Sequence, residues 1–109
     1  MATPLEDVRL RSSDPDVARA VSEPVLLALG ARAGLDVSRL DELAIALCIA
    51  IAAAVPGPVT TDMRRAGGRV SVTVSPVAHD RLLGRRTLLE GLSASVVADG
   101  DTIALSLDA

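Results

Sequence analysis

Few side chains in this 109-residue chain are suited to catalysis. His79 and Asp80 are adjacent and could form an acid–base pair, but no serine or cysteine nucleophile can be placed beside them from the sequence. The single Cys48 lies in an apolar run, where a free cysteine is usually a small buried hydrophobic residue. One His and one Cys give no zinc-ligand spacing, and a chain without lysine has no phosphate-binding P-loop. The sequence therefore predicts no catalytic residue, no metal site and no bound cofactor.

All 11 basic residues are arginine, and six of them form two groups: Arg64, Arg65 and Arg69, and Arg81, Arg85 and Arg86. Such groups could bind an acidic partner or a phosphate, although exposed arginines more often contribute only solubility. Asp41 and Glu42 are also adjacent, but neighbouring helix residues point in different directions. Their place in the first turn of a predicted helix favours interaction with the helix dipole over acid–base catalysis.

The composition predicts one globular domain that comprises residues 1–109. Half of the residues are hydrophobic, the mean hydropathy is +0.42 and no residue is aromatic, so the core must be aliphatic. The net charge is −3, from 14 acidic and 11 basic residues. An acidic chain without aromatic residues lacks the groups that neutralise phosphates and stack on bases. We therefore expect no nucleic-acid binding.

Three features predict a cytoplasmic protein without a membrane segment. The apolar run at residues 43–55 is shorter than the roughly 20 residues that span a bilayer. The first ten residues, MATPLEDVRL, contain no apolar segment typical of a signal peptide. A single cysteine forms no internal disulfide, which fits a reducing compartment.

The first third of the chain predicts a strand followed by a helix. Residues 5–11 alternate weakly and could form an edge strand. Asp14 before Pro15 is typical of a helix start, and Gly34 of a helix end. The predicted buried stripe of this helix is Val17, Val21, Val25 and Leu29, widened by Leu26 and Ala28. Pro24 removes a backbone donor, which predicts a kink or a break just before it.

A second helix is predicted from Ser38, with Asp41 completing a capping signature. Its most buried stripe should be Leu40, Leu43, Leu47, Ile51 and Ala54. Ile45, Ile49 and Ala52 on the other side are apolar too, and a helix that is apolar all round is covered on most of its surface. This helix should lie between a sheet and another helix or a partner protein, and we expect a homo-oligomer, most simply a dimer.

The second half of the chain predicts two hairpins separated by a helix. Four segments alternate with a period of two: residues 59–64, 70–75, 93–98 and 102–107. Asp99-Gly100 suits the tight turn of the second hairpin, and a third helix is predicted at residues 80–92. The resulting order, β-α-α-β-β-α-β-β, predicts an α+β fold. We expect a two-layer sandwich, with a mixed, mostly antiparallel five-stranded sheet and about three helices on one face.

Two segments carry a resemblance to a known family. They are ARAGLDVSRLDELAIALCIAIAAAV, residues 31–55, and LLGRRTLLEGLSASVVADGDTIALSLD, residues 82–108. Together with the order of elements, they resemble the GHKL (histidine-kinase-like) ATPase superfamily. More narrowly, the chain looks like the bacterial anti-sigma-factor serine kinases of partner-switching regulation. The resemblance implies a GHKL or Bergerat-like fold that covers nearly the whole chain.

The same alignment implies that the ATP site is degenerate. The family's N box has an Asp, a Glu that serves as general base and an Asn that holds magnesium. These positions are occupied here by Cys48, Ile49 and Ala53. The ATP lid and the D-x-G-x-G box are missing. The second glycine box survives only around Gly84, so that Gly84, Arg85 and Arg86 are the residual candidates for an anion site.

The resemblance therefore implies a non-catalytic regulatory module that has lost its ATP site and binds a protein. The partners it implies are a sigma factor, an anti-sigma antagonist or a second copy, in the regulation of transcription. One alternative is an active ATP-dependent serine/threonine kinase with a site rebuilt from His79, Asp80 and nearby arginines. A second alternative is an unrelated α/β dimerisation domain.

Overall fold

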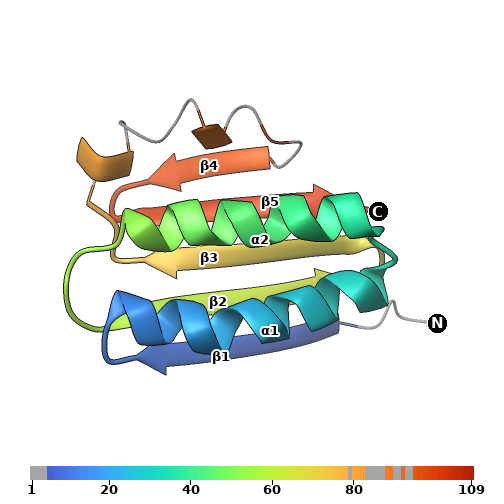
Figure 1. Cartoon of the computed structure of the whole chain (residues 1–109), viewed down its shortest axis with the longest axis horizontal. Helices are drawn as coiled ribbons and strands as arrows, with labels where there is room; N and C mark the ends of the chain where they lie inside the picture. The colour runs from blue at the N-terminus through green and yellow to red at the C-terminus, as the bar shows by residue number, and fades with distance from the viewer. Residues whose placement is uncertain (1–4, 79, 83–87, 90–91, 93–94) are drawn as a thin grey trace.

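The computed structural model describes residues 5–78, 80–82, 88–89, 92 and 95–109. Its elements are, in chain order, β1 (Leu5–Ser12), α1 (Pro15–Ala33), α2 (Val37–Ala52), β2 (Val59–Ala66), β3 (Arg69–Ser75), β4 (Ser95–Asp99) and β5 (Thr102–Asp108). The strands form one sheet in the order β1-β2-β3-β5-β4, and all four neighbouring pairs are antiparallel (Figure 1). The predicted order of the strands along the chain is confirmed.

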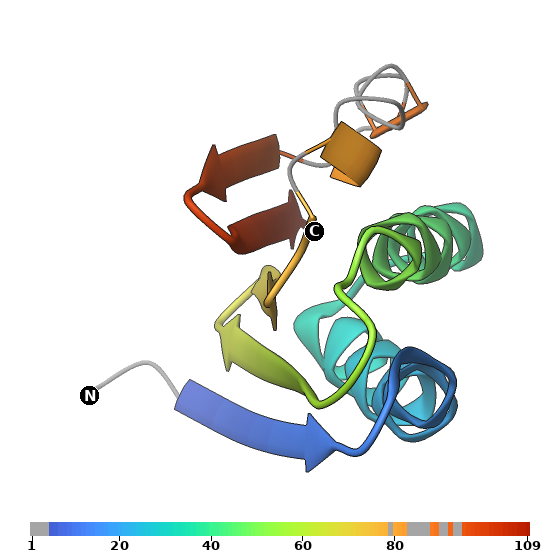
Figure 2. The same cartoon turned by 90° about the vertical axis from the view of Figure 1, so that its left-hand side faces the viewer.

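Both helices lie on the same face of the sheet (Figure 2). α1 packs on β1 and β2, and α2 packs on β3 and β5 and beside α1. The expected α+β sandwich with a five-stranded sheet is therefore confirmed. Where the third helix was predicted, residues 80–82 and 88–89 are helical, and the rest of that segment lies outside the described residues.

The core lies between the helices and the inner face of the sheet. Alternate residues of the three central strands are buried there: Val59, Thr61, Met63, Val70, Val72, Val74, Ile103, Leu105 and Leu107. Leu26 and Leu29 of α1 and Leu43, Leu47 and Ile51 of α2 cover them. One buried face and one solvated face are typical of an antiparallel sheet with helices on one side.

The predicted buried stripe of α1 is confirmed at Leu26 and Leu29 but is wrong in the N-terminal half of the helix. Val17 and Val21 are 41% and 43% exposed, whereas Ala18 and Ser22 are completely buried. The physical reason is a hydrogen bond in the core, because the Ser22 Oγ lies 2.7 Å from the Thr61 Oγ1 on β2. A buried hydroxyl needs such a partner, so the polar pair turns the helix and leaves two valines at the surface.

Of the kink or break predicted near Ser22, the break is wrong, because α1 is one helix from Pro15 to Ala33 with Pro24 inside it. Ser22 before the proline and Leu26 after it are both buried against the same face of the sheet. Packing on both sides of the proline therefore outweighs the loss of one backbone hydrogen bond.

The helix caps agree with the sequence at one helix and differ at the other. The Asp14 carboxylate accepts a hydrogen bond from the Val17 amide at 2.9 Å, and Gly34 ends α1 with a φ of 94°. For α2 the prediction of Ser38 is wrong, because Asp36 is the N-cap and accepts from the Arg39 amide at 2.9 Å. Asp36 is extended, as an N-cap requires, and Ser38 already lies within the first turn.

Gly30 determines how closely the two helices approach. A Cβ atom on this residue would lie 2.7 Å from the Leu40 Cδ2 and 3.2 Å from the Leu43 Cδ2. The glycine therefore allows leucines of α2 to lie directly on the backbone of α1.

We expect the buried Ser22–Thr61 pair to behave as a unit. Either Ser22→Ala or Thr61→Val leaves one buried hydroxyl without its partner and should lower the free energy of unfolding by about 1–3 kcal/mol. The double variant removes both hydroxyls and should be no less stable than either single variant, as measured by urea denaturation. Thr73→Val, the same change on the outer face of β3, is the control; additive losses in the double variant would contradict the expectation.

Candidate functional site

The three positions aligned with the N box lie in the second half of α2 and just after it. Ala53 is the C-cap residue of α2 and is completely buried in the core. Cys48 and Ile49 are half-buried on α2. Ile49 packs against the core, so two of the three positions contribute to the packing of the fold.

The end of α2 is held by the chain segment that follows β3. The Ala78 amide donates to the Ala53 carbonyl at 2.7 Å, and the Val55 amide donates to the Pro76 carbonyl at 2.9 Å. On the same segment, the Arg81 guanidinium donates to the Ala54 carbonyl at 3.3 Å. These bonds connect the end of α2 to residues 76–81.

These bonds leave few backbone amides at the end of α2 free to bind a ligand. The amides of Val55 and Ala78 already donate within the chain, and the Leu82 amide bonds to the Ala78 carbonyl at 3.0 Å. Across the residues that the structure describes, no group of three His, Cys, Asp or Glu side chains could hold a metal ion. In the described part of this region the only carboxylate is Asp80, which is exposed, and no group of metal ligands is present.

The arginines singled out in the sequence fall into two cases. In the first group, Arg64 bonds to Asp7 at 3.1 Å and the Arg69 guanidinium donates to Ser106 at 3.1 Å. Arg65 forms an ion pair with Glu6. Their role in the described structure is therefore cross-strand pairing. Gly84, Arg85, Arg86 and His79 lie outside the described residues, so the anion site near Gly84 stays a prediction.

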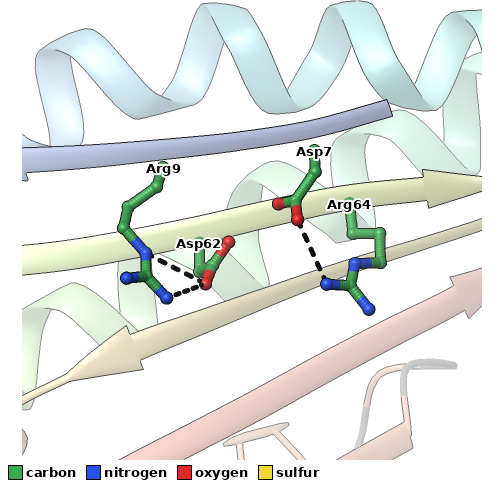
Figure 3. Close-up of polar contacts among 4 residues, drawn as sticks. All are labelled: Asp7, Arg9, Asp62 and Arg64. Carbon is green, nitrogen blue, oxygen red and sulfur yellow. Dashed lines mark hydrogen bonds and ion pairs between the residues drawn. The ribbon is translucent and has the colours of Figure 1, made fainter. Parts of the chain in front are cut away.

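A charged cluster on the outer face of the sheet was missed in the sequence. Figure 3 shows Arg9 beside Asp62 and Arg64 beside Asp7. The Arg9 Nη2 lies 2.9 Å from the Asp62 Oδ2. The register places Arg9 opposite Asp62 and Asp7 opposite Arg64. A signal was present, because each strand carries the pattern Asp-x-Arg, but only the pairing of β1 with β2 brings the two patterns together.

The shallow depression beside this cluster is charge-balanced. It has a volume of about 180 Å³ and is lined by Asp62, Arg64, Ser71 and Thr73. The hydrogen bond from Arg9, together with its positive charge, lowers the pKa of Asp62 below its ordinary value of 3.8. Asp62 is therefore ionised at neutral pH and unsuited to donate a proton. One carboxylate and one guanidinium, each with a partner, do not favour a charged ligand.

The outward side of α2 is apolar and open. Ile45 is 49% exposed and Ala52 is exposed, with the half-buried Cys48 and Ile49 between them. We call these four residues the α2 surface. The predicted contacts of α2 with a sheet and another helix are present, whereas its outward side has no cover within the described chain. An exposed apolar patch of this kind is typical of a protein-binding surface.

Comparison with known proteins adds no relative: no family model matches this chain, and no curated protein is significantly similar to it. Within the described residues, neither helix combines the length and the apolar character needed to cross a bilayer. The candidate sites are therefore the α2 surface and the charged outer face of the sheet.

We expect Arg9→Met to raise the pKa of Asp62 toward 3.8, because the variant removes the hydrogen bond that favours the carboxylate. Side-chain carboxyl NMR over a pH titration measures the shift, and Arg69→Met is the matched control away from Asp62. Because the folded-state pKa is lowered, the stabilisation by Asp62 is complete above its unfolded pKa and disappears as the pH falls through the folded pKa. An unchanged pKa in Arg9→Met would contradict this assignment.

Proposed function

We propose that this protein is a non-catalytic regulatory module that binds another protein, similar in layout to an anti-sigma-factor serine kinase without its ATP site. The observation that carries the proposal is the apolar, closed end of α2. Ile49 and Ala53 stand at the positions aligned with the general base and the magnesium ligand, and Ala53 is buried. The backbone amides nearby are used by residues 76–82.

The physical argument concerns the cost of placing a triphosphate there. Phosphoryl transfer depends on metal ions and donor groups set against the charge that develops on the phosphate. A hydrocarbon surface supplies none of these, and burying charge without partners costs several kcal/mol. Nucleotide chemistry at this end of α2 is therefore disfavoured, and a protein ligand on an apolar surface is favoured.

The α2 surface is the proposed contact with the partner. It carries no charge, and Ile45 at its N-terminal end, the most exposed of its large side chains, can insert into an apolar groove or pack against an amphipathic helix. The partners that the family resemblance implies are a sigma factor or an anti-sigma antagonist, encountered in the cytoplasm. The proposal thus places the module in the regulation of transcription through protein binding alone.

An active ATP-dependent serine/threonine kinase would need a site rebuilt around Asp80 and the arginines that follow it. In the structure Asp80 is exposed, and Arg81 is bound to the Ala54 carbonyl at the end of α2. This interaction uses the arginine to close the fold, which favours the non-catalytic module over the kinase.

We expect no magnesium-dependent binding of ATP, because apolar residues replace the groups that would hold the metal and the triphosphate. Isothermal titration calorimetry with ATP and magnesium, compared with magnesium alone, measures this directly, and a thermal-shift assay provides an independent readout. Saturable, magnesium-dependent heat would refute the loss of the ATP site.

We expect the purified protein to bind at least one purified sigma factor or anti-sigma antagonist of its own organism. Ile45→Arg should weaken that binding by about tenfold or more, because a charge would enter an apolar contact. The free energy of unfolding should change little, since Ile45 is half exposed.

Biolayer interferometry measures the affinity of the wild type and of Ile45→Arg for each candidate sigma factor or antagonist. Val97→Arg, on an exposed valine of β4, is the matched control and should bind like the wild type. Equal affinity of Ile45→Arg and wild type would show that the α2 surface is not the contact.

A further inference from the structure

β1 is a long and regular edge strand. All eight of its residues pair with β2, from Leu5 opposite Ala66 to Ser12 opposite Val59, without a bulge. Within the described chain, no strand pairs with its other side. Natural proteins protect such edges with prolines, bulges, short strands or charged side chains, and of these devices β1 has only the charged side chains. An edge of this kind accepts another strand only where the charges of the two strands match.

The charges on β1 form a self-complementary pattern. Asp7-Val8-Arg9 on β1 lies antiparallel to Asp62-Met63-Arg64 on β2, so that each carboxylate faces a guanidinium. The resulting ion pairs measure 2.9 Å and 3.1 Å (Figure 3). Two Asp-x-Arg strands therefore match when they run antiparallel. β1 carries this pattern itself, so a second β1 would match it in the same way.

We propose that two copies of this chain pair through β1, antiparallel and about a two-fold axis at Val8, and join their sheets into one. In this register Asp7 of each copy faces Arg9 of the other, as Asp7 faces Arg64 within the chain. Two-fold registers centred on Asp7 or on Arg9 would set that residue against itself, and like charges directly opposite are destabilising. The charge pattern thus selects one register, as a two-fold interface requires.

The exposed side of α1 supports the same interface. Arg32 of α1 forms an ion pair with Glu6 of β1 at 3.1 Å, which shows that this side of the helix faces the β1 edge. Val21, Val25 and Ala28 share this side with Arg32 by their spacing of three or four residues.

α1 packs across β2 and β1 at that end of the sheet (Figure 2), so joining two β1 strands brings the two α1 helices toward one another. Val21 and its neighbour Val17 are the exposed valines of α1 that this contact would cover. The expected homo-oligomer is therefore assigned to β1 and α1 instead of α2. This leaves the α2 surface available to another protein.

Sedimentation equilibrium of the full chain tests the proposal with a pair of charge reversals. The wild type should be a dimer. Asp7→Arg and Arg9→Asp should each raise the dimer dissociation constant by about tenfold or more, because two opposite-charge pairs become like-charge pairs. An equimolar mixture of the two variants should restore a dimer, since Arg at position 7 then faces Asp at position 9. Restoration also shows that both variants are folded.

A second comparison tests the contribution of α1. Val21→Arg should weaken the dimer, whereas Val97→Arg on β4 and Ile45→Arg on α2 should leave it unchanged. A monomeric wild type at high concentration, a mixture that stays monomeric, or a dimer lost in Ile45→Arg but kept in Asp7→Arg would each overturn the proposal. The first two outcomes leave the α2 surface free for a sigma factor or an antagonist, whereas the third would place α2 in the dimer. The separate binding measurement with each candidate partner distinguishes failure of the proposed function from failure of this proposal.

Discussion

An entirely aliphatic core requires the helices of this protein to lie close to the sheet. Without aromatic side chains to fill space, contact depends on small residues facing inward, such as Ala18, Ala46 and Ala50, which are completely buried. Gly30 likewise allows α1 and α2 to approach each other closely, because it has no side chain at their contact. Protein interiors are close-packed, so this short-range fit determines the position of both helices and the placement of everything that they expose.

The Ser22–Thr61 hydrogen bond then determines the rotation of α1. By turning a hydroxyl into the core, it turns Val17 and Val21 outward and brings Arg32 to Glu6 at the edge of the sheet. A single buried polar contact thus determines which side chains of α1 are exposed at the surface. It converts an ordinary amphipathic helix into one that presents apolar side chains beside an open strand.

The β1 edge of the sheet and the end of α2 have different characters. At the β1 edge, opposite charges alternate along the strand and across to β2, and the described backbone is regular. On the other side of the fold, the end of α2 is closed by residues 76–81 with backbone and guanidinium hydrogen bonds. The first arrangement suits association with another strand, whereas the second stabilises the fold at the positions that the proposed resemblance aligns with a nucleotide site. This separation supports a protein whose function is binding.

Local sequence patterns predicted the elements but not their contacts. The alternation of Val70, Val72 and Val74, with that of Ile103, Leu105 and Leu107, was sufficient for the strands, because period-two burial is a local property. Asp14, Pro15 and Gly34 marked the ends of α1 for the same reason. The rotation of α1 could not be predicted, because it depends on two hydroxyls 39 residues apart in the chain.

The same distinction applies to the candidate sites. The apolar character of α2, including Cys48 and Ile49, was determined by the sequence itself. That Asp7 faces Arg64, that β1 is an edge and that residues 76–81 hold the end of α2 were decided only by the tertiary structure. The physical reason is that burial and capping depend on near neighbours in the chain, whereas charge pairing and closure depend on which strands and segments the fold places side by side.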